Sequence, residues 1–234
     1  MRKSIILAFT LCIAANAADW KYYCFGFLNA APDRKELPKA EVDEIQKGHI
    51  GHMGKMAAAG KLLVAGPFMT DGGPRGVVIY NCASVDEAMG YTQPDPAVVN
   101  KRLTMEFYKM HAPEGLGEPL ASKMKADPNY KYEMTRLPLF ILNKGANMKS
   151  GYPSKETGQA HYQRSLKLME EGKLRFFGRF EDAPEKLGVY VFAKMPIEEA
   201  KALMDDDPLV AGGYARAQGL VWFVADEAVP GSKK

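Results

Sequence analysis

Histidine, cysteine and tryptophan are scarce in this 234-residue sequence, which contains four, three and two of them. With so few histidines and cysteines, and no acidic cluster beside them, the sequence does not predict a metal centre. An excess of charge of one sign is also lacking, since 31 Lys and Arg residues balance 28 Asp and Glu residues. Because the two signs are interspersed, we expect neither nucleic acid nor an anionic membrane surface as a partner.

Long hydrophobic runs are absent except near the N-terminus. There, Arg2 and Lys3 precede an apolar run over residues 5–15, and Ala15, Asn16 and Ala17 follow. The run is shorter than the roughly 20 residues that cross a bilayer, and small residues around position 17 suit a signal peptidase. We therefore predict a cleaved signal peptide over residues 1–17 and a periplasmic or secreted protein that is not embedded in a membrane.

Cys12 raises the alternative of a lipoprotein. The residues before it, Phe9, Thr10 and Leu11, lack the small side chains that precede a lipidated cysteine, which favours the ordinary signal peptide.

The rest of the chain repeats itself at a fixed offset of 112 residues. Without gaps, residues 49–100 match residues 161–212 at 14 of 52 positions, where unrelated sequences would match at roughly three. A proline- and glycine-rich segment separates the two copies. We predict a first domain over residues 18–112, a linker over 113–129, a second domain over 130–228 and a short tail over 229–234.

Each copy has the same predicted order of elements, βαββαβ. In copy one, Gly60 ends a predicted helix, and Ser84 with Glu87 has the spacing of a helix-capping box. The predicted segments of copy one are strand 21–28, helix 41–59, strands 62–68 and 76–82, a helix after Ser84 and strand 103–110. Those of copy two are strand 135–142, helix 156–171, strands 174–180 and 188–193, helix 197–204 and strand 219–224.

This order is that of a ferredoxin-like α+β fold, a four-stranded antiparallel sheet with both helices on one face. The apolar strands would leave the other face of each sheet exposed, so we expect the two copies to cover each other. We therefore predict a monomer in which the two copies form an intrachain pseudo-dimer. Further self-association of such monomers is left open.

Two cysteines, Cys24 and Cys82, remain after the predicted cleavage. The first strand runs antiparallel beside the third in this topology, which brings the two residues near each other. An oxidising compartment would then allow a disulfide, and the alternative is a pair of buried thiols.

The order of several short motifs resembles the YCII (YciI-like) family. His49 lies eleven residues before a Gly-Lys-Leu-Leu-Val-Ala-Gly-Pro segment starting at Gly60, and Asp95-Pro96 follows the second helix. Copy two has His161, Gly172, Gly178 and Asp207-Pro208 at the matching places. The resemblance covers nearly all of the chain after the predicted signal and implies the dimeric α+β barrel arrangement.

The resemblance also implies a catalytic His–Asp pair in a pocket of each copy, His49 with Asp95 and His161 with Asp207. A carboxylate bonded to one imidazole nitrogen fixes the tautomer and makes the other nitrogen a general base or acid near neutral pH. A related member is a dehydrochlorinase of a chlorinated hydroxyquinol, which makes elimination from a small cyclic substrate one concrete reaction.

The same residues also fit simpler, non-catalytic roles. His49 borders the apolar positions Met53 and Met56, which is typical of a core histidine. Asp95 and Asp207 precede prolines, where aspartate often only forms a turn. Copy one has Ala97 where the family has a bulky residue, and copy two has Phe177-Gly178-Arg179 in place of Ala-Gly-Pro, so either site could be degenerate.

Arg175 and Arg179 fall on one face of a predicted strand and are candidates for binding an anionic ligand, although such residues more often face solvent. His49 and His52, three apart on a helix, could share a metal ion, but copy two has Arg164 in the second place and no further ligands complete a site. We therefore predict neither a metal nor a cofactor.

The sequence leads to two main functional hypotheses. One is an exported, YCII-like small-molecule enzyme, lyase-like or hydrolase-like, that uses a His–Asp pair in one or both copies. The other is an exported protein that binds a small molecule in the same pocket without transforming it. A structural duplicate without working sites is the third.

Overall fold

The fold is that of a computed structural model, which describes residues 19–70, 72–127, 129–181, 183 and 185–231. The predicted signal peptide, Cys12 and the last three residues of the predicted tail lie outside the described residues. Among the helices that are described, none combines the length and apolar composition needed to cross a bilayer.

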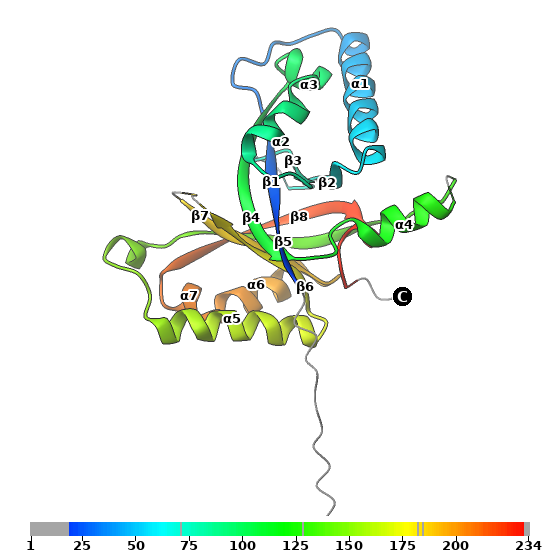
Figure 1. The fold of residues 1–234 in the computed structure, drawn as a ribbon. Helices are drawn as coiled ribbons and strands as arrows, with labels where there is room; N and C mark the ends of the chain where they lie inside the picture. Colours follow the sequence, from blue (N-terminus) through cyan, green and yellow to red (C-terminus); the bar gives the residue numbers. More distant parts are fainter. Residues whose placement is uncertain (1–18, 71, 128, 182, 184, 232–234) are drawn as a thin grey trace, which may run out of the picture.

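The two halves of the chain contain the same series of elements (Figure 1). The first half consists of β1 (Trp20–Ala30), α1 (Lys39–Ala58), β2 (Leu62–Pro67), β3 (Gly76–Tyr80), α2 (Val85–Thr92), α3 (Pro96–Val99) and β4 (Leu103–Pro113). Helix α4 (Glu118–Ala126) follows within the predicted linker. The second half consists of β5 (Met134–Lys144), the 3-10 helix η1 (Ala146–Lys149), α5 (Lys155–Glu170), β6 (Leu174–Glu181), β7 (Lys186–Phe192), α6 (Ile197–Asp205), α7 (Pro208–Ala211), β8 (Ala215–Ala225) and the 3-10 helix η2 (Asp226–Ala228).

The eight strands form one antiparallel sheet in the order β2-β3-β1-β4-β6-β7-β5-β8. Strand β4 joins the halves by pairing with β6, where Met110 lies opposite Phe180. At the matching place of the other edge, Phe68 bridges to Trp222 of β8, and the indole Nε1 of Trp222 donates to Gly66 O over 3.1 Å. The sheet is thereby closed into a barrel, which confirms the predicted α+β architecture of two ferredoxin-like repeats.

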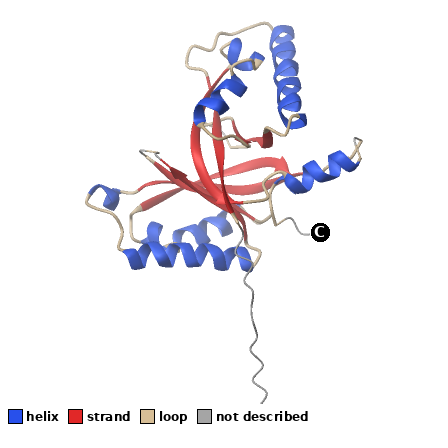
Figure 2. Ribbon diagram, in the orientation of Figure 1, coloured by secondary structure: helices blue, strands red, loops and turns tan. Residues whose placement is uncertain are grey.

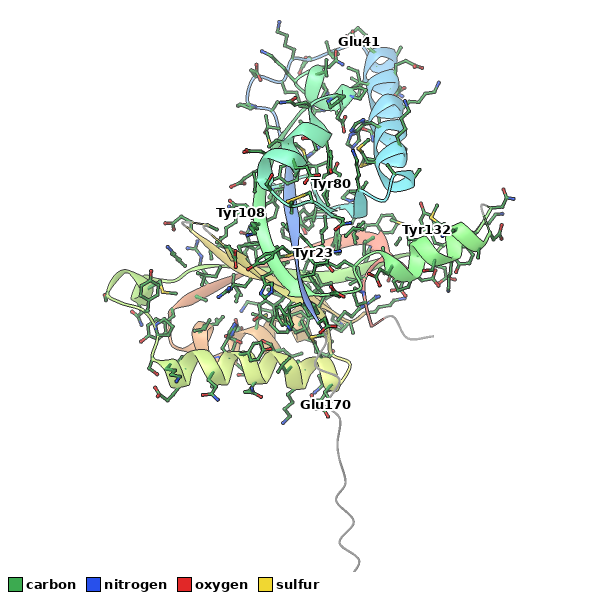
Figure 3. The ribbon with its side chains drawn as sticks, in the orientation of Figure 1. Tyr23, Glu41, Tyr80, Tyr108, Tyr132 and Glu170 are labelled. Carbon is green, nitrogen blue, oxygen red and sulfur yellow. A yellow bond between two sulfur atoms is a disulfide. The ribbon has the colours of Figure 1, made fainter. Side chains whose placement is uncertain are left out.

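The helices lie outside the sheet in two groups, α1–α3 on one side of the molecule and α5–α7 on the opposite side (Figures 1 and 2). The largest core cluster contains side chains of both halves, among them Phe25, Met110, Phe176 and Trp222. Tyr23 and Tyr108, from strands of the first half, lie where the two halves meet (Figure 3). One smaller core cluster lies under the helices of each half. The inner sheet faces therefore cover each other, as the apolar strands require.

Local chemistry explains where the main helices begin and end. The Ser84 hydroxyl accepts a hydrogen bond from Glu87 N over 3.2 Å, which confirms the predicted cap of α2. Gly60 and Gly172 follow α1 and α5 with φ of +69° and +68°, a conformation that suits glycine at the end of a helix. The same signal at the same offset thus ends the first helix of each copy.

Four features differ from the predicted elements. The segments after Asp95 and Asp207 form the short helices α3 and α7, and the predicted linker contains α4. Strand β8 begins at Ala215, before the predicted start at Gly219. Gly219 instead lies within the strand, at a point where a Cβ would come 2.8 Å from the Phe140 ring. That glycine accommodates a neighbouring aromatic side chain and does not start the strand.

Candidate functional site

His49 lies on the inner side of α1 and is almost completely buried, with 6% of its surface exposed. Its Nδ1 lies 2.7 Å from Asp95 Oδ2. Because a carboxylate oxygen only accepts, Nδ1 carries the proton of this hydrogen bond. The structure therefore brings together the first pair of residues predicted from the sequence.

Asp95 is held in place by the short helix that it caps. Its second oxygen, Oδ1, accepts a hydrogen bond from Ala97 N over 2.8 Å, and Pro96 occupies the first position of α3. Asp95 thus forms the turn and also binds the histidine, since one oxygen serves each purpose. Because the Asp95 side chain is fixed by this cap, its carboxylate stays oriented toward His49 and loses little conformational entropy on binding it.

Copy two has the same arrangement. His161 Nδ1 lies 2.9 and 2.8 Å from the two oxygens of Asp207, and Leu209 N donates to Asp207 Oδ1 over 2.9 Å. The second predicted pair is therefore also brought together, and Asp207 caps the N-terminus of α7 as Asp95 caps that of α3.

The two copies differ at the other imidazole nitrogen. The Tyr190 hydroxyl lies 2.9 Å from His161 Nε2 and 3.1 Å from the Ser165 hydroxyl. Burial raises the pKa of Tyr190 above its ordinary value, so the phenol stays protonated near neutral pH and donates to His161 Nε2. The imidazole of copy two is thus held at both nitrogens.

In copy one, Val78 occupies the position of Tyr190 at the 112-residue offset. Among the described residues, His49 Nε2 has no hydrogen-bond partner, and every fully buried side-chain nitrogen or oxygen does have one. His49 Nε2 is therefore not fully buried, and His49 is one of the residues that line the cavity of copy one. This free nitrogen is what a general base requires.

The cavity of copy one has a volume of about 700 Å³ and lies between α1 and the sheet. Its lining includes His49, apolar side chains of α1, the strands β2 and β3, and three arginines, Arg34, Arg75 and Arg102. Met134, which begins β5 of the other half, also contributes to its wall. The volume suits a small organic molecule.

The cavity of copy two is larger, about 1140 Å³, and is rich in aromatic side chains. His161 and Tyr190 lie in its wall, and Trp20 reaches it from β1 of the first half. The indole ring of Trp20 lies 5.3 Å from the Phe177 ring and 5.2 Å from His111. The wall of each cavity thus includes a residue from the first strand of the opposite half.

The two arginines predicted to bind a ligand face different surroundings. Arg179 is exposed and lines the cavity of copy two, where its Nη2 lies 3.3 Å from Glu181. Arg175 is 5% exposed and donates to Asp226, Val229 and Pro230 of the C-terminal segment. The prediction of a shared face is wrong because a bulge between Leu174 and Phe176 shifts the alternation of β6 by one residue.

His52 does not join His49 in a metal site. Its Nε2 donates to the Tyr91 carbonyl of α2 over 2.8 Å. Within the described part of the chain, no group of three or more His, Cys, Asp or Glu side chains is placed to hold a metal ion.

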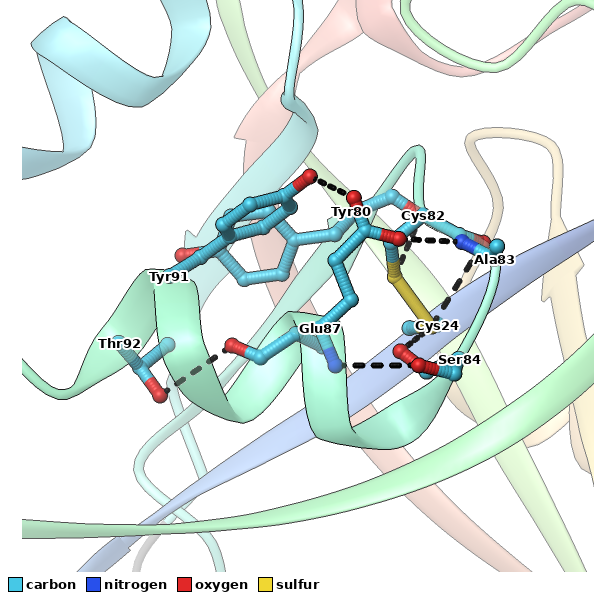
Figure 4. The surroundings of a disulfide bond; sticks show 9 residues. Cys24, Tyr80, Cys82, Ala83, Ser84, Glu87, Tyr91 and Thr92 are labelled. Atoms are coloured by element: carbon cyan, nitrogen blue, oxygen red, sulfur yellow. Dashed lines mark hydrogen bonds between the residues drawn. A yellow bond between two sulfur atoms is a disulfide. The ribbon is translucent and has the colours of Figure 1, made fainter.

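Cys24 and Cys82 are joined in a disulfide, with their Cα atoms 6.1 Å apart (Figure 4). The bond ties β1 to the segment between β3 and α2. Beside it, the Glu87 carboxylate accepts from Ala83 N over 2.8 Å and from the Tyr91 hydroxyl, which fixes the start of α2.

Sequence reasoning missed Tyr190 and the three arginines of the copy-one cavity. Comparing the copies position by position would have shown Tyr190 as a polar residue where the other strand has valine. The arginines come from three separate loops, so no local spacing in the sequence connects them.

No protein-family model and no curated protein matches the chain. Among solved structures, a mutant chlorite dismutase from Candidatus Nitrospira defluvii in complex with cyanide is similar, with 12% identity and a TM-score of 0.56. The match covers 91% of this chain and 93% of that one. A heme-binding protein from Thermus thermophilus has 18% identity and a TM-score of 0.49 over 90% and 92% of the two chains. At these identities, the likeness to chlorite dismutase establishes the dimeric α+β barrel fold.

Proposed function

We propose that the protein is an enzyme acting on a small molecule, with His49 of copy one as its general base and Asp95 as the residue that positions it. The observation that carries this proposal is the asymmetry of His49, which lines a cavity: Nδ1 is held by Asp95 at 2.7 Å, while Nε2 has no partner among the described residues.

The proposed step is lyase-like. His49 Nε2 takes a proton from a carbon of the bound substrate, the electrons of that C–H bond form a double bond, and a leaving group departs with its own electron pair. Asp95 keeps the proton on Nδ1 and stabilises the imidazolium that forms. With a water molecule in place of the C–H group, the same base would support hydrolysis, which is the alternative reaction class.

Copy two is proposed to bind rather than to start a reaction. Tyr190 already donates to His161 Nε2, so a substrate proton would have to displace the Tyr190 hydroxyl. The aromatic walls and the larger volume favour a site that holds a small molecule without transforming it. The hypotheses of an enzyme and of a binding protein then apply to different halves of one chain.

Export and membership of the YCII-like group remain part of the proposal. The signal-like N-terminal pattern and the His–Asp order in both copies support them. A disulfide between Cys24 and Cys82 is consistent with a periplasmic or secreted protein, because such bonds persist in oxidising compartments.

The two histidines can also be compared as axial ligands of heme, because an imidazole nitrogen is a common ligand of heme iron. Heme iron needs a free imidazole nitrogen. At His161 the Tyr190 hydroxyl occupies that position, so the residues of copy two do not fit. His49 offers a free Nε2, and a Soret band with added hemin that disappears in His49→Gln would contradict the proposal of a base that acts without a metal.

The proposal is tested by chloride release from a chlorinated hydroxyquinol and from chlorinated carboxylic acids of similar size. We expect His49→Gln to lower turnover by about 10²–10⁴-fold, the usual contribution of a general base. His161→Gln is the matched control and should retain turnover. Equal turnover in wild type and His49→Gln, loss only in His161→Gln, or no release from any compound would contradict the proposal.

A further inference from the structure

Three arginines from separate loops near the end of β1 line the copy-one cavity. Arg34 lies between β1 and α1, Arg75 immediately precedes β3, and Arg102 immediately precedes β4. Backbone hydrogen bonds hold these loops to the end of β1, from Ala31 N to Arg102 O over 3.2 Å and from Arg75 N to Leu28 O over 2.6 Å. Their convergence is therefore a property of the fold.

No acidic side chain of the described residues neutralises this cluster. Among the residues that the structure describes, no carboxylate lies within 4.0 Å of the three guanidinium groups, and Arg102 Nη1 donates to the backbone at Lys35 O over 2.5 Å. Asp33, which immediately precedes Arg34 in the sequence, pairs with Lys101 at 3.1 Å. Desolvation of its guanidinium group, followed by the neighbouring charges of Arg102 and Arg75, lowers the pKa of Arg34. Like charges gathered without a counter-charge are suited to an anionic ligand.

The rest of the cavity is largely apolar. Val42, Ile45 and Met53 line it from α1, on the same helix face as His49. A ligand whose charged group lies on the arginines would place its apolar part against this face, beside the imidazole.

Copy two lacks the cluster, although it has the same fold. Leu187 and Tyr214 stand where Arg75 and Arg102 stand in copy one, and the loop after β5 contributes Met148 to the cavity. The two cations that line the second cavity are paired, Arg179 with Glu181 at 3.3 Å and Lys186 with Glu106 at 3.2 Å. The unpaired positive charge thus belongs to the half whose histidine has a free nitrogen.

We propose that the substrate of copy one is a small organic anion, a carboxylate with an apolar body. Its carboxylate is bound by Arg34, Arg75 and Arg102, and its reacting C–H group is presented to His49 Nε2. This inference rests on the proposed function for the reacting group, but the anion site itself does not depend on catalysis.

The test uses the full mature chain and three probes of similar shape, benzoate, phenylphosphonate and the neutral benzamide, with binding measured by isothermal titration calorimetry. We expect one benzoate per chain, and benzamide to bind at least about tenfold more weakly. Affinity for benzoate should fall as salt rises. Tighter binding of phenylphosphonate than of benzoate would overturn the assignment of a carboxylate.

Arg34→Gln/Arg75→Gln tests the residues, because both side chains are exposed and their removal should leave the core intact. We expect this double variant to weaken benzoate binding by about tenfold or more. Arg216→Gln, an exposed arginine that lines neither cavity, is the matched control and should bind within about twofold of wild type. Equal affinity for benzoate and benzamide, no benzoate binding to wild type, or an unchanged double variant would overturn the anion site.

His49→Gln separates this inference from the proposed function. The affinity of this variant for benzoate should stay within about threefold of the wild-type affinity, while its turnover is lost. If it binds benzoate and also keeps turnover, the anion site stands and His49 is not the base. If turnover depends on His49 but the arginine variant binds benzoate normally, the base stands and the anion site is wrong.

Discussion

At the scale of single residues, the two halves use the same His–Asp pair in different surroundings. In each copy an aspartate caps a short helix and holds the imidazole Nδ1, with one oxygen for each role in Asp95 and with both oxygens of Asp207 near His161. Tyr190 then occupies the remaining nitrogen of His161, whereas copy one has Val78 at that position and His49 Nε2 has no partner within the described part of the chain. A single substitution between the repeats therefore separates a proposed base from a fully hydrogen-bonded histidine.

Asp95→Asn should lower turnover by about 10²–10⁴-fold, because an amide no longer fixes the Nδ1–H tautomer or stabilises the imidazolium. The fold should persist, since the amide oxygen still caps α3. Steady-state kinetics with a denaturation midpoint for each variant would check this. Asp207→Asn is the control, and an equal loss of turnover in both variants would contradict the assignment of the base to copy one.

Tyr23 provides a prediction of pH dependence. Burial, followed by the charge of Glu114, raises the pKa of Tyr23 to about 12. Because the unfolded value is lower, at about 10, the stability that the neutral phenol contributes is fully present below pH 10 and is lost as the pH rises through 12. Urea midpoints measured between pH 8 and 12 should fall less steeply in Tyr23→Phe than in wild type. Identical slopes would contradict this role.

The residues of the site were partly predictable. The repeat and the family resemblance identified both His–Asp pairs, because those residues recur at one offset. Arg175 was misjudged, because a bulge in β6 cannot be read from the alternation of side chains. Arg34, Arg75 and Arg102 were missed because only the folded chain brings their loops together.

At the scale of elements, hydrophobic periodicity and turn residues predicted the main strands and helices of both copies. The misses share a cause, which is that short elements depend on tertiary contacts. Helices α3 and α7 are four residues long and rely on the caps that Asp95 and Asp207 provide. Helix α4 in the linker is held by contacts such as Lys123 with Glu227, which lie 104 residues apart in sequence.

The two seams of the barrel should differ in their tolerance of a methyl group. A Cβ at Gly66 would lie 2.2 Å from the backbone oxygen of Phe223, whereas one at Gly178 would meet the Met110 side chain at 2.7 Å. Backbone cannot move aside as a methionine side chain can. We expect Gly66→Ala to cost about 1–3 kcal/mol of unfolding free energy and Gly178→Ala less. Urea denaturation of both variants checks the order, and a larger loss in Gly178→Ala would contradict it.

At the scale of the whole molecule, the duplication explains why the barrel closes within one chain. The interior cluster takes side chains from both halves, and the seams β4–β6 and β2–β8 occupy equivalent places in the repeat. The fold class was predictable because each repeat alone would expose an apolar sheet face. The family resemblance predicted the barrel arrangement, and the structure adds the pairs of strands that close it, β4 with β6 and β2 with β8.

Residues 19–113 produced alone should not form a folded monomer, because the inner face with Phe25, Phe27 and Ile79 would be exposed to water. We expect this half to self-associate or aggregate, and size-exclusion chromatography with light scattering would show it. A monomeric half with a cooperative unfolding transition would contradict the need for both halves.

The central claim is that the two imidazoles differ at Nε2, and the most direct measurement is ¹⁵N NMR of histidine-labelled protein, titrated until both rings are neutral. We predict a proton on Nδ1 of His49 with an unprotonated, unbonded Nε2. The Nε2 signal of His161 should carry a hydrogen-bond shift that Tyr190→Phe removes, while His49 stays unchanged. A proton on Nε2 of His49, or the same Nε2 shift in both residues, would contradict the claim.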